Sequence, residues 1–301
     1  MPKGDKKNPA AMAKFAFSEI MDGLPVVKVV DVGPSTAEAG SEPYAPLFKR
    51  AMARVVGFDA NEADCALLNE RAGGRHVYLP YVLGDGTVQT FHVCRDVAGS
   101  SLREPDVGTV ALFQELDGIA EVIERRSVST RRLDDIPEAA GADFLRLDAP
   151  GGTLAVLAGA ERLAEELVVL HVAVDFVALY RDQPLFADVD RALRERGFAF
   201  HKFTALGGRS FKPLVIGTDA NDPLSQMLTA EAVYVPDFAA LDRLPPEKLL
   251  KLAVVMHEVY GSYDLTALAL RHFDAQTEGG LWPSYVRRLT GARTPRGTAF
   301  A

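Results

Sequence analysis

Cysteine is scarce in this chain of 301 residues, which contains only Cys65 and Cys94. Two thiols cannot build a disulfide framework or a four-cysteine zinc site, and they are typical of a protein from a reducing compartment. We therefore expect two buried or half-buried thiols and a cytoplasmic location. Histidines at H-x-x-x-H spacing are also missing, so the sequence predicts no metal site.

Long apolar runs and an excess of basic residues are missing too. The longest apolar stretch, 167–180, is interrupted by His171 and Asp175 and is shorter than the roughly 20 residues that a membrane span needs. The 33 Lys and Arg residues against 41 Asp and Glu residues give a net charge of −8, which disfavours nucleic acid as a partner. We expect neither a membrane-spanning segment nor a nucleic-acid-binding surface. A hydrophobic fraction of 48% with 25% charged residues is typical of a folded chain.

Runs of β-branched and apolar residues alternate with helical patterns along most of the chain. Strands are expected at 26–32, 54–59, 76–83, 143–148, 167–174 and 198–203, with 211–216 as the antiparallel mate of the last. Helices are expected at 43–54, 61–73, 153–163 and 184–197. Parallel strands joined by helices need right-handed crossover connections, and the connecting helices cover both faces of the sheet. We therefore predict a doubly wound, mostly parallel, seven-stranded α/β domain over 24–220. The segment 87–94 is expected as an added hairpin arm and 96–127 as a lid or active-site loop.

The two ends of the chain lack this alternation. Residues 1–23 are expected as a basic N-terminal leader and 291–301 as a flexible tail. Between 221 and 290 we predict a helical extension, in which one helix starts at Pro245-Pro246 and another is capped by Ser262 or Asp264. Its apolar residues are expected to bury against the sheet domain or a second subunit, so the chain is a candidate homo-oligomer.

Four aspartates lie at or just beyond the carboxyl ends of the first four expected strands of the domain. They are Asp31, Asp59, Asp85 and Asp148. Open α/β sheets bind ligands beyond the carboxyl ends of their strands, so these side chains are expected to share one site. Asp59 is placed to accept hydrogen bonds from two ribose hydroxyls, Asp85 to meet an adenine amino group, and Asp148 to face what lies beyond the nucleoside.

The loop after the first strand excludes the common dinucleotide and triphosphate sites. Gly33 is followed by Pro34 and by no further glycine until Gly40, so G-x-G-x-x-G is absent, and no G-x-x-x-x-G-K-[ST] occurs. The acid Asp31 would also repel a pyrophosphate. A single strand-end aspartate is most often a turn or cap residue. Four at one edge favour a cationic nucleoside such as S-adenosylmethionine.

Several stretches carry a resemblance to a known family, in this order along the chain: VVDVGPS with SEPYAPL, VVGFDANEADCALLN, LGDGTVQTFHVC, SSLREPD, VSTRRLDDI, DFLRLDAPGGTLAVLAGAERL, QPLFADVDRALRERGF, and AEAVYVPDF with LLKLAVVMHEVYGSYDL. From about Val27 through Phe273 the chain resembles the FkbM-type S-adenosylmethionine-dependent methyltransferases. The resemblance implies a class I methyltransferase fold and S-adenosylmethionine as the cofactor. It implies cofactor-binding positions at Asp31, Gly33, Ser35, Asp59, Ala60 and Asp85.

The turn after the fourth strand departs from the family pattern. Where the family usually has D-x-x-G-x-E after a lysine, this chain has Arg146 two residues before Asp148, and Thr153 at the glutamate position. Pro150 stiffens a turn that is usually polar, and Ala173 stands where the fifth strand often carries an acid.

Family members characteristically methylate oxygen atoms of sugars, polyketides and related small metabolites. We therefore expect an O-methyltransferase acting on a hydroxyl of a small polar or saccharide-like acceptor, with Asp148 as the base or the residue that orients the acceptor. The alternative is a non-catalytic methyltransferase-like partner or binding subunit that keeps the fold. A nicotinamide oxidoreductase is disfavoured because its glycine fingerprint is missing.

Overall fold

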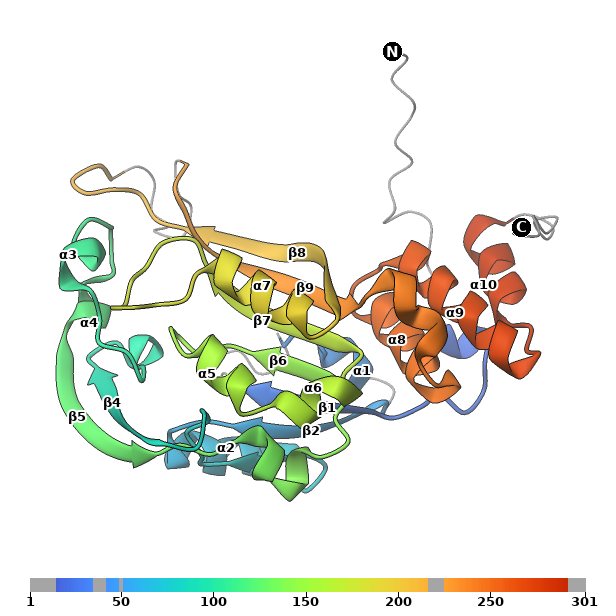
Figure 1. Cartoon of the computed structure of the whole chain (residues 1–301), viewed down its shortest axis with the longest axis horizontal. Helices are drawn as coiled ribbons and strands as arrows, with labels where there is room; N and C mark the ends of the chain where they lie inside the picture. The colour runs from blue at the N-terminus through green and yellow to red at the C-terminus, as the bar shows by residue number, and fades with distance from the viewer. Residues whose placement is uncertain (1–14, 35–41, 49–50, 216–224, 292–301) are drawn as a thin grey trace, which may run out of the picture. The chain divides into compact units, whose positions relative to one another are not determined.

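The computed structural model describes residues 15–34, 42–48, 51–215 and 225–291 of the chain (Figure 1). The chain divides into two compact units, one of residues 28–37 and 55–237, the other of residues 1–27, 38–54 and 238–301. In the part that is described, no helix is long and apolar enough to cross a membrane. The predictions for Ser35 and for most of the leader and the tail fall outside the described residues.

The strands are β1 (Val27–Val32), β2 (Ala53–Phe58), β3 (Val77–Leu79), β4 (Val88–Cys94), β5 (Val122–Ser129), β6 (Phe144–Leu147), β7 (Val169–Asp175), β8 (Phe198–Gly208) and β9 (Met227–Pro236). The α-helices are α1 (Ala45–Phe48), α2 (Glu62–Ala72), α3 (Val107–Val110), α4 (Asp117–Ala120), α5 (Thr153–Ala158), α6 (Glu161–Glu166), α7 (Phe186–Glu195), α8 (Pro246–Glu258), α9 (Tyr263–Thr277) and α10 (Leu281–Thr290). Short 3-10 helices are η2 (Phe17–Glu19), η3 (Val97–Gly99), η4 (Leu133–Asp135), η5 (Pro137–Ala139) and η6 (Phe238–Arg243).

The main sheet has seven strands in the order β3-β2-β1-β6-β7-β9-β8. The pairs β2–β3, β1–β6 and β6–β7 are parallel, and β9 runs antiparallel to both β7 and β8. This order confirms the predicted doubly wound, mostly parallel sheet. The strand order reverses between β1 and β6, where ligands bind in sheets of this kind.

The predicted antiparallel mate of β8 is wrong. The described part of the expected strand 211–216 forms no strand, and Phe211 makes only an isolated bridge to Phe113. The mate is β9, which comes after residue 220, the expected end of the sheet domain. Pro213 cannot donate a ladder hydrogen bond, whereas the alternating residues of β9 fit between two strands.

The helix boundaries follow the local signals in part. The side chain of Asn61 caps α2 by accepting from the backbone of Ala63, and Gly73 ends it with φ of +57°, as predicted. The expected helix over 43–54 shrinks to α1, because β2 already begins at Ala53. The expected helix over 153–163 is split near Gly159, where an added Cβ would lie 2.1 Å from the carbonyl oxygen of Gly84.

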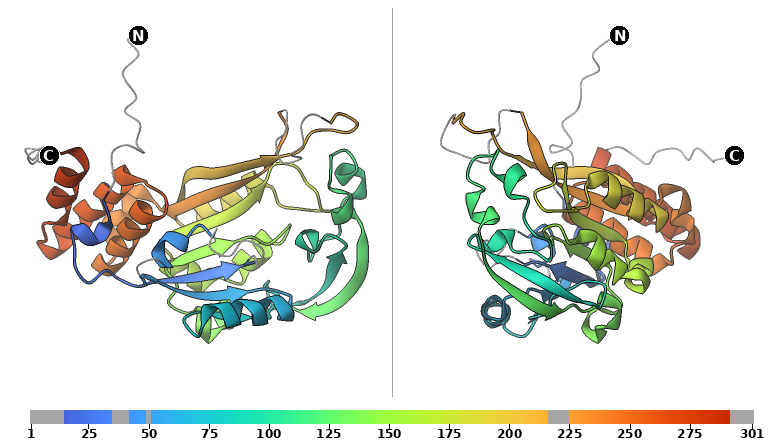
Figure 2. Two further views of the ribbon diagram at one scale, coloured as in Figure 1. Left: turned by 180° about the vertical axis from the view of Figure 1, so that it is seen from behind. Right: turned by 60° about the vertical axis from the view of Figure 1, so that its left-hand side comes forward.

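The two faces of the main sheet differ in character. One face packs against α5, α6 and α7, which lie side by side in Figure 1, and its core residues alternate along the strands, as with Val30 and Val32 in β1 or Leu145 and Leu147 in β6. The alternate positions face the opposite side of the sheet, which the left view of Figure 2 shows from behind. These positions include Asp31, Arg146, His171 and Glu231.

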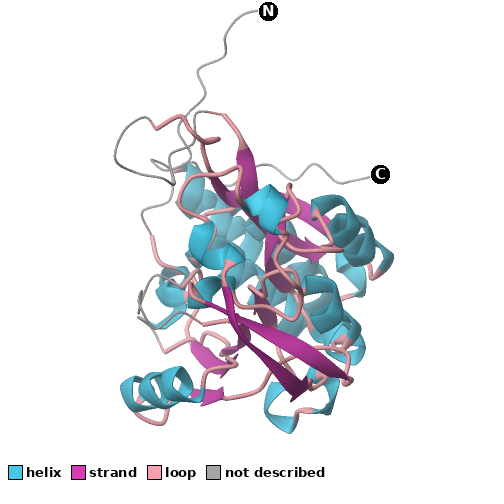
Figure 3. Ribbon diagram, turned by 90° about the vertical axis from the view of Figure 1, so that its left-hand side faces the viewer, coloured by secondary structure: helices cyan, strands magenta, loops and turns pink. Residues whose placement is uncertain are grey.

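Residues 87–129 insert a separate element between β3 and β6. In Figure 3, β4 and β5 form an antiparallel two-stranded sheet, so the predicted hairpin arm has its partner in β5. The expected lid or loop over 96–127 contains η3, α3 and α4, but the prediction is wrong at its end, because 122–127 belong to β5. It has its own core, in which Val110, Phe113 and Leu116 pack against Leu179, Tyr180 and Leu228.

The other unit contains the predicted helices α8 and α9, and α10 in addition. Leu249, Leu252, Met256 and Leu265 are buried, as their helical spacing predicts. Pro246 opens α8 and Ser262 precedes α9, although no side-chain bond caps α9 at Ser262. His257 of α8 is held on both sides, 3.0 Å from the Tyr285 hydroxyl and 3.0 Å from the Phe15 carbonyl, so it is a structural residue.

Candidate functional site

Arg146 of β6 joins the ends of the two central strands. Its Nη1 lies 3.1 Å from Oδ1 of Asp31 in β1, and its Nη2 lies 2.7 Å from Oδ2 of Asp148. Nη1 also donates to the carbonyl oxygen of Gly33 at 2.6 Å. Burial opposes the charge of Arg146, but Asp31 and Asp148 outweigh this effect and raise its pKa. One guanidinium therefore fixes both strand-end loops.

The sheet register extends this charged row to the neighbouring strands. Asp31 is paired with Arg146, and Arg146 with His171 of β7. Nε2 of His171 lies 2.9 Å from Oε2 of Glu231 in β9. Asp31 and His171 are almost completely buried, at 0% and 3% exposure, so the row is an internal network rather than a solvated face.

Gly33 brings the loop after β1 against the loop after β6. Its φ is +76°, and a Cβ at this position would lie 2.2 Å from the carbonyl oxygen of Asp148. The amide of Asp148 donates to the carbonyl of Val32 at 3.1 Å. Only glycine satisfies both the backbone conformation and the close approach.

Asp59 lies at the end of β2, partly exposed, and Ala60 after it is exposed. Burial raises the pKa of Asp59, while the amide of Asn61, which donates to its Oδ1 at 2.7 Å, lowers it. The carboxylate is held in position by this bond at the edge where Gly33 turns. A partly exposed, oriented carboxylate there fits a hydroxyl-bearing ligand.

Asp85 lies between β3 and β4, and its carboxylate takes part in a local turn. Oδ1 accepts from the Thr87 hydroxyl at 2.6 Å, from the Thr87 amide at 3.0 Å and from the Gln89 amide group at 3.1 Å. The Thr87 hydroxyl is the main cause of its lowered pKa. Asp85 thus has a structural task in this turn, and its contact with the adenine stays a prediction.

Asp148 combines an ion pair with contact to solvent. Its side chain is 39% exposed although Arg146 binds it. Desolvation raises its pKa, and Arg146 opposes that shift. A carboxylate in a concave site has both properties, since protein atoms surround it while one side stays open.

Asp175, at the end of β7, is a functional candidate that the sequence analysis did not select. Its Oδ2 accepts from Nε2 of Gln183 at 2.5 Å, and Oε1 of Gln183 accepts from the amides of Leu179 and Tyr180. These two amides fix the orientation of the Gln183 side chain. The pKa of Asp175 is raised to about 6, mainly by burial and in smaller part by the charges of Asp148 and Glu231, while the hydrogen bond from Gln183 lowers it. The strand-end rule that selected the other aspartates applies to Asp175 as well.

The segment after η3 is fastened to the loops after β6 and β7. The Ser101 hydroxyl donates to the carbonyl of Pro150 at 2.5 Å, and Nε of Arg103 donates to the carbonyl of Gly151 at 2.7 Å. The Tyr180 hydroxyl donates to the carbonyl of Gly99 at 2.9 Å. The insertion is therefore a fixed wall beside Asp148 and Asp175.

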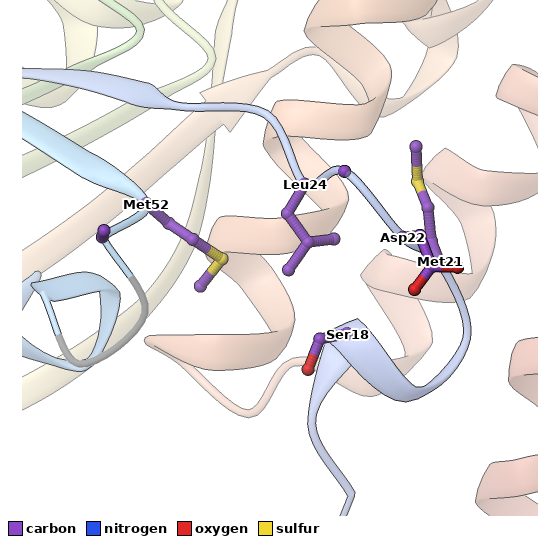
Figure 4. Close-up of a pocket in the computed structure, with 7 residues that line it drawn as sticks. Ser18, Met21, Asp22, Leu24 and Met52 are labelled. Carbon is purple, nitrogen blue, oxygen red and sulfur yellow. The ribbon is translucent and has the colours of Figure 1, made fainter.

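A pocket of about 380 Å³ lies elsewhere, in the other unit. Figure 4 shows its lining by Ser18, Met21, Asp22, Leu24 and Met52, which precede β1 and β2 in the chain. It is therefore not at the carboxyl ends of the strands.

Among the residues described, no three His, Cys, Asp or Glu side chains are grouped as a metal site. Cys65 and Cys94 are both buried, as predicted.

Comparisons with known proteins give a family and several similar structures. The model of the methyltransferase FkbM domain matches residues 14–200. A comparison with curated proteins gave no match. Among solved structures, the chain is similar to a putative methyltransferase from Thermoplasma acidophilum (10% identity, 71% of this chain and 70% of that chain, TM-score 0.35). It is also similar to a precorrin-6y C5,15-methyltransferase from Geobacter metallireducens GS-15 (11% identity, 73% of this chain and 85% of that chain, TM-score 0.35). A third similar structure is a TehB-like SAM-dependent methyltransferase from Corynebacterium glutamicum (12% identity, 76% of this chain and 91% of that chain, TM-score 0.32).

The close approach at Gly33 predicts a stability difference between two glycine substitutions. Gly33→Ala introduces both strain at φ of +76° and a clash with Asp148, whereas Gly74→Ala, at φ of +78°, has nothing within 4 Å of the new Cβ. We expect Gly74→Ala to cost about 1 kcal/mol of unfolding free energy and Gly33→Ala at least about 2 kcal/mol more. Urea denaturation of the two variants measures the difference. Equal losses would show that the two loops do not touch.

Proposed function

Because this chain belongs to the FkbM methyltransferase family and uses S-adenosylmethionine, we propose that it methylates a hydroxyl oxygen of a small, polar, saccharide-like acceptor. The observation that carries this proposal is the pair Asp148 and Asp175 at one edge of the sheet, the first held by Arg146 and the second by Gln183. Such an edge offers one carboxylate to orient a hydroxyl and another to accept its proton. We further propose that the protein acts in the cytoplasm, on a small molecule rather than nucleic acid, and as a homo-oligomer.

We assign the cofactor to the carboxyl ends of β1, β2 and β3. The turn at Gly33 would approach the ligand through backbone, Asp59 with Ala60 would bind the ribose, and Asp85 would face the adenine. Ser35 is also proposed as a cofactor-binding residue, and it lies outside the described residues. For Asp31 we propose a role other than the expected cofactor contact, since its carboxylate is fully buried and bound by Arg146. Its proposed role is to position Arg146 and the loop rather than to touch the cofactor.

When bound, S-adenosylmethionine supplies a methyl group on a positively charged sulfur, and the bond electrons stay with that sulfur as the acceptor oxygen takes the methyl group. The chain must then position the hydroxyl and remove its proton. A proton on Asp148 would weaken its ion pair with Arg146, whereas a proton on Asp175 disturbs a single bond to a neutral amide. We therefore assign the proton to Asp175 and the orientation of the acceptor to Asp148.

The second candidate function is a non-catalytic methyltransferase-like subunit. The observation that favours it is Thr153, which occupies the family glutamate position and is buried at the start of α5. Such a subunit would bind the cofactor and release no S-adenosylhomocysteine with any acceptor. An acceptor screen on the wild type and on Thr153→Glu separates the two functions.

Asp59→Asn is expected to weaken cofactor binding. The amide of Asn has one oxygen, so it cannot accept a hydrogen bond from each ribose hydroxyl on a separate oxygen as a carboxylate does. Losing a hydrogen bond to a charged acceptor costs about 1.5–3 kcal/mol, or about 10- to 150-fold in affinity. Isothermal titration with S-adenosylhomocysteine measures the loss. The control is Glu70→Gln on the exposed side of α2, which should leave affinity unchanged. Equal affinity in the two folded variants would refute the ribose assignment.

The pH dependence of methyl transfer is expected to report Asp175. Since its pKa is raised to about 6, kcat/KM should fall as the pH drops through about 6, because the protonated carboxyl cannot accept a proton. Asp175→Asn should lower kcat by about 100-fold or more and remove this acid limb. Asp148→Asn should lower activity but keep the limb, and Asp182→Asn, on an exposed neighbour, should change neither. An acid limb that persists in Asp175→Asn assigns the proton to another group.

A further inference from the structure

Arg103 stands out in the wall beside the proposed acceptor site. Its backbone amide donates to the Ser101 hydroxyl at 3.0 Å, and its side-chain bonds go to main-chain carbonyls, that of Gly151 at 2.7 Å and that of Arg181 at 3.4 Å. Carbonyl oxygens orient a guanidinium but carry no net charge. In the part of the chain that is described, no carboxylate forms an ion pair with Arg103.

The nearby arginines are balanced, in contrast. Arg125 and Arg181 both bind Glu104, at 3.0 Å and 3.3 Å. Together they lower the pKa of Glu104, the hydrogen bond from Arg125 being the largest cause. The charge of Arg181 also acts on Asp106, which caps α3. Glu104 and Asp106 thus compensate the charges of Arg125 and Arg181, and no carboxylate compensates the charge of Arg103 among the described residues.

The side chain of Arg103 is held close to the reacting edge. An added Cβ on Gly151 would lie 3.1 Å from Cδ of Arg103 and 3.4 Å from the Tyr180 ring, so the arginine stem and this ring flank the turn that follows Asp148. Tyr180 in turn donates its amide to Gln183, the residue that holds Asp175. Arg103 and the two carboxylates therefore border the same loops, those after β6 and β7.

We propose that Arg103 binds an anionic group of the acceptor, a carboxylate or a phosphate. This inference rests on the proposed function and adds the substrate class, an acidic saccharide-like metabolite. The acceptor would place its anion on Arg103 and its hydroxyl at Asp148 and Asp175. Arginine suits this task because its planar donors match carboxylate and phosphate oxygens in pairs.

The first test measures anion binding without catalysis. Inorganic phosphate is titrated at constant ionic strength into protein saturated with S-adenosylhomocysteine. The wild type and Arg126→Gln, an exposed arginine paired with Glu124 on β5, should bind equally, and Arg103→Gln about tenfold more weakly or worse. Arg103→Lys, which keeps the charge and a donor for the Gly151 carbonyl, should bind with intermediate affinity and guards against a folding defect. Equal phosphate binding in the wild type and Arg103→Gln would overturn the inference.

The second test separates the two anions and the two proposals. Glucose, glucuronate and glucose 6-phosphate are offered as acceptors, with release of S-adenosylhomocysteine as the readout. The wild type should show a KM about tenfold lower for one of the charged sugars than for glucose, and Arg103→Gln should lose this advantage while kcat changes less. Methylation of all three sugars with equal KM would overturn the inference and leave the proposed function intact. Arg103-dependent phosphate binding without transfer to any sugar would support the anion site and contradict the proposed function.

Discussion

The ion pairs of Arg146 with Asp31 and Asp148 are the interaction on which the rest of the site depends. Asp31 is completely buried, and removing one partner of a buried pair typically costs about 3–5 kcal/mol because the other charge is left unpaired. The same guanidinium binds the carbonyl of Gly33, so the loops after β1 and β6 are fixed together. Because the strand order reverses between these two strands, this contact lies where an open sheet binds its ligand.

The proposed site combines acidic residues at the strand ends with a basic residue in the wall. Asp31, Asp148, Asp175 and Glu231 act on one another electrostatically, with Arg146 as the central cation. This excess of acid suits the positive sulfonium and ammonium groups of the cofactor. The wall formed by the insertion between β3 and β6 instead presents Arg103. A positively charged cofactor and a negatively charged acceptor would thus be directed to different sides of one edge.

Local signals in the sequence predicted much of the fold but only part of the site. The cap at Asn61 and the stop at Gly73 give the ends of α2, and the alternation of apolar residues gives most of the parallel strands. The bond between Asp31 and Arg146 could not be predicted, since the two residues are 115 positions apart and only the register of β1 and β6 pairs them. The strand β9 was missed for a similar reason, because which segment pairs with the edge strand β8 depends on tertiary packing. Asp175 could have been selected from the sequence, because it also lies at the end of an expected strand. It was not selected because the preceding apolar residues suggested only a buried strand.

A crystal structure of the protein with bound S-adenosylhomocysteine would show directly where the cofactor binds. We expect the nucleoside to lie beyond the carboxyl ends of β1, β2 and β3, with both ribose hydroxyls on Asp59 and the homocysteine sulfur facing Asp148 and Asp175. The bond between Arg146 and Asp31 should be retained in that complex. Density for the nucleoside elsewhere, for example in the pocket of Ser18 and Met52, or a ribose with no contact to Asp59, would contradict it.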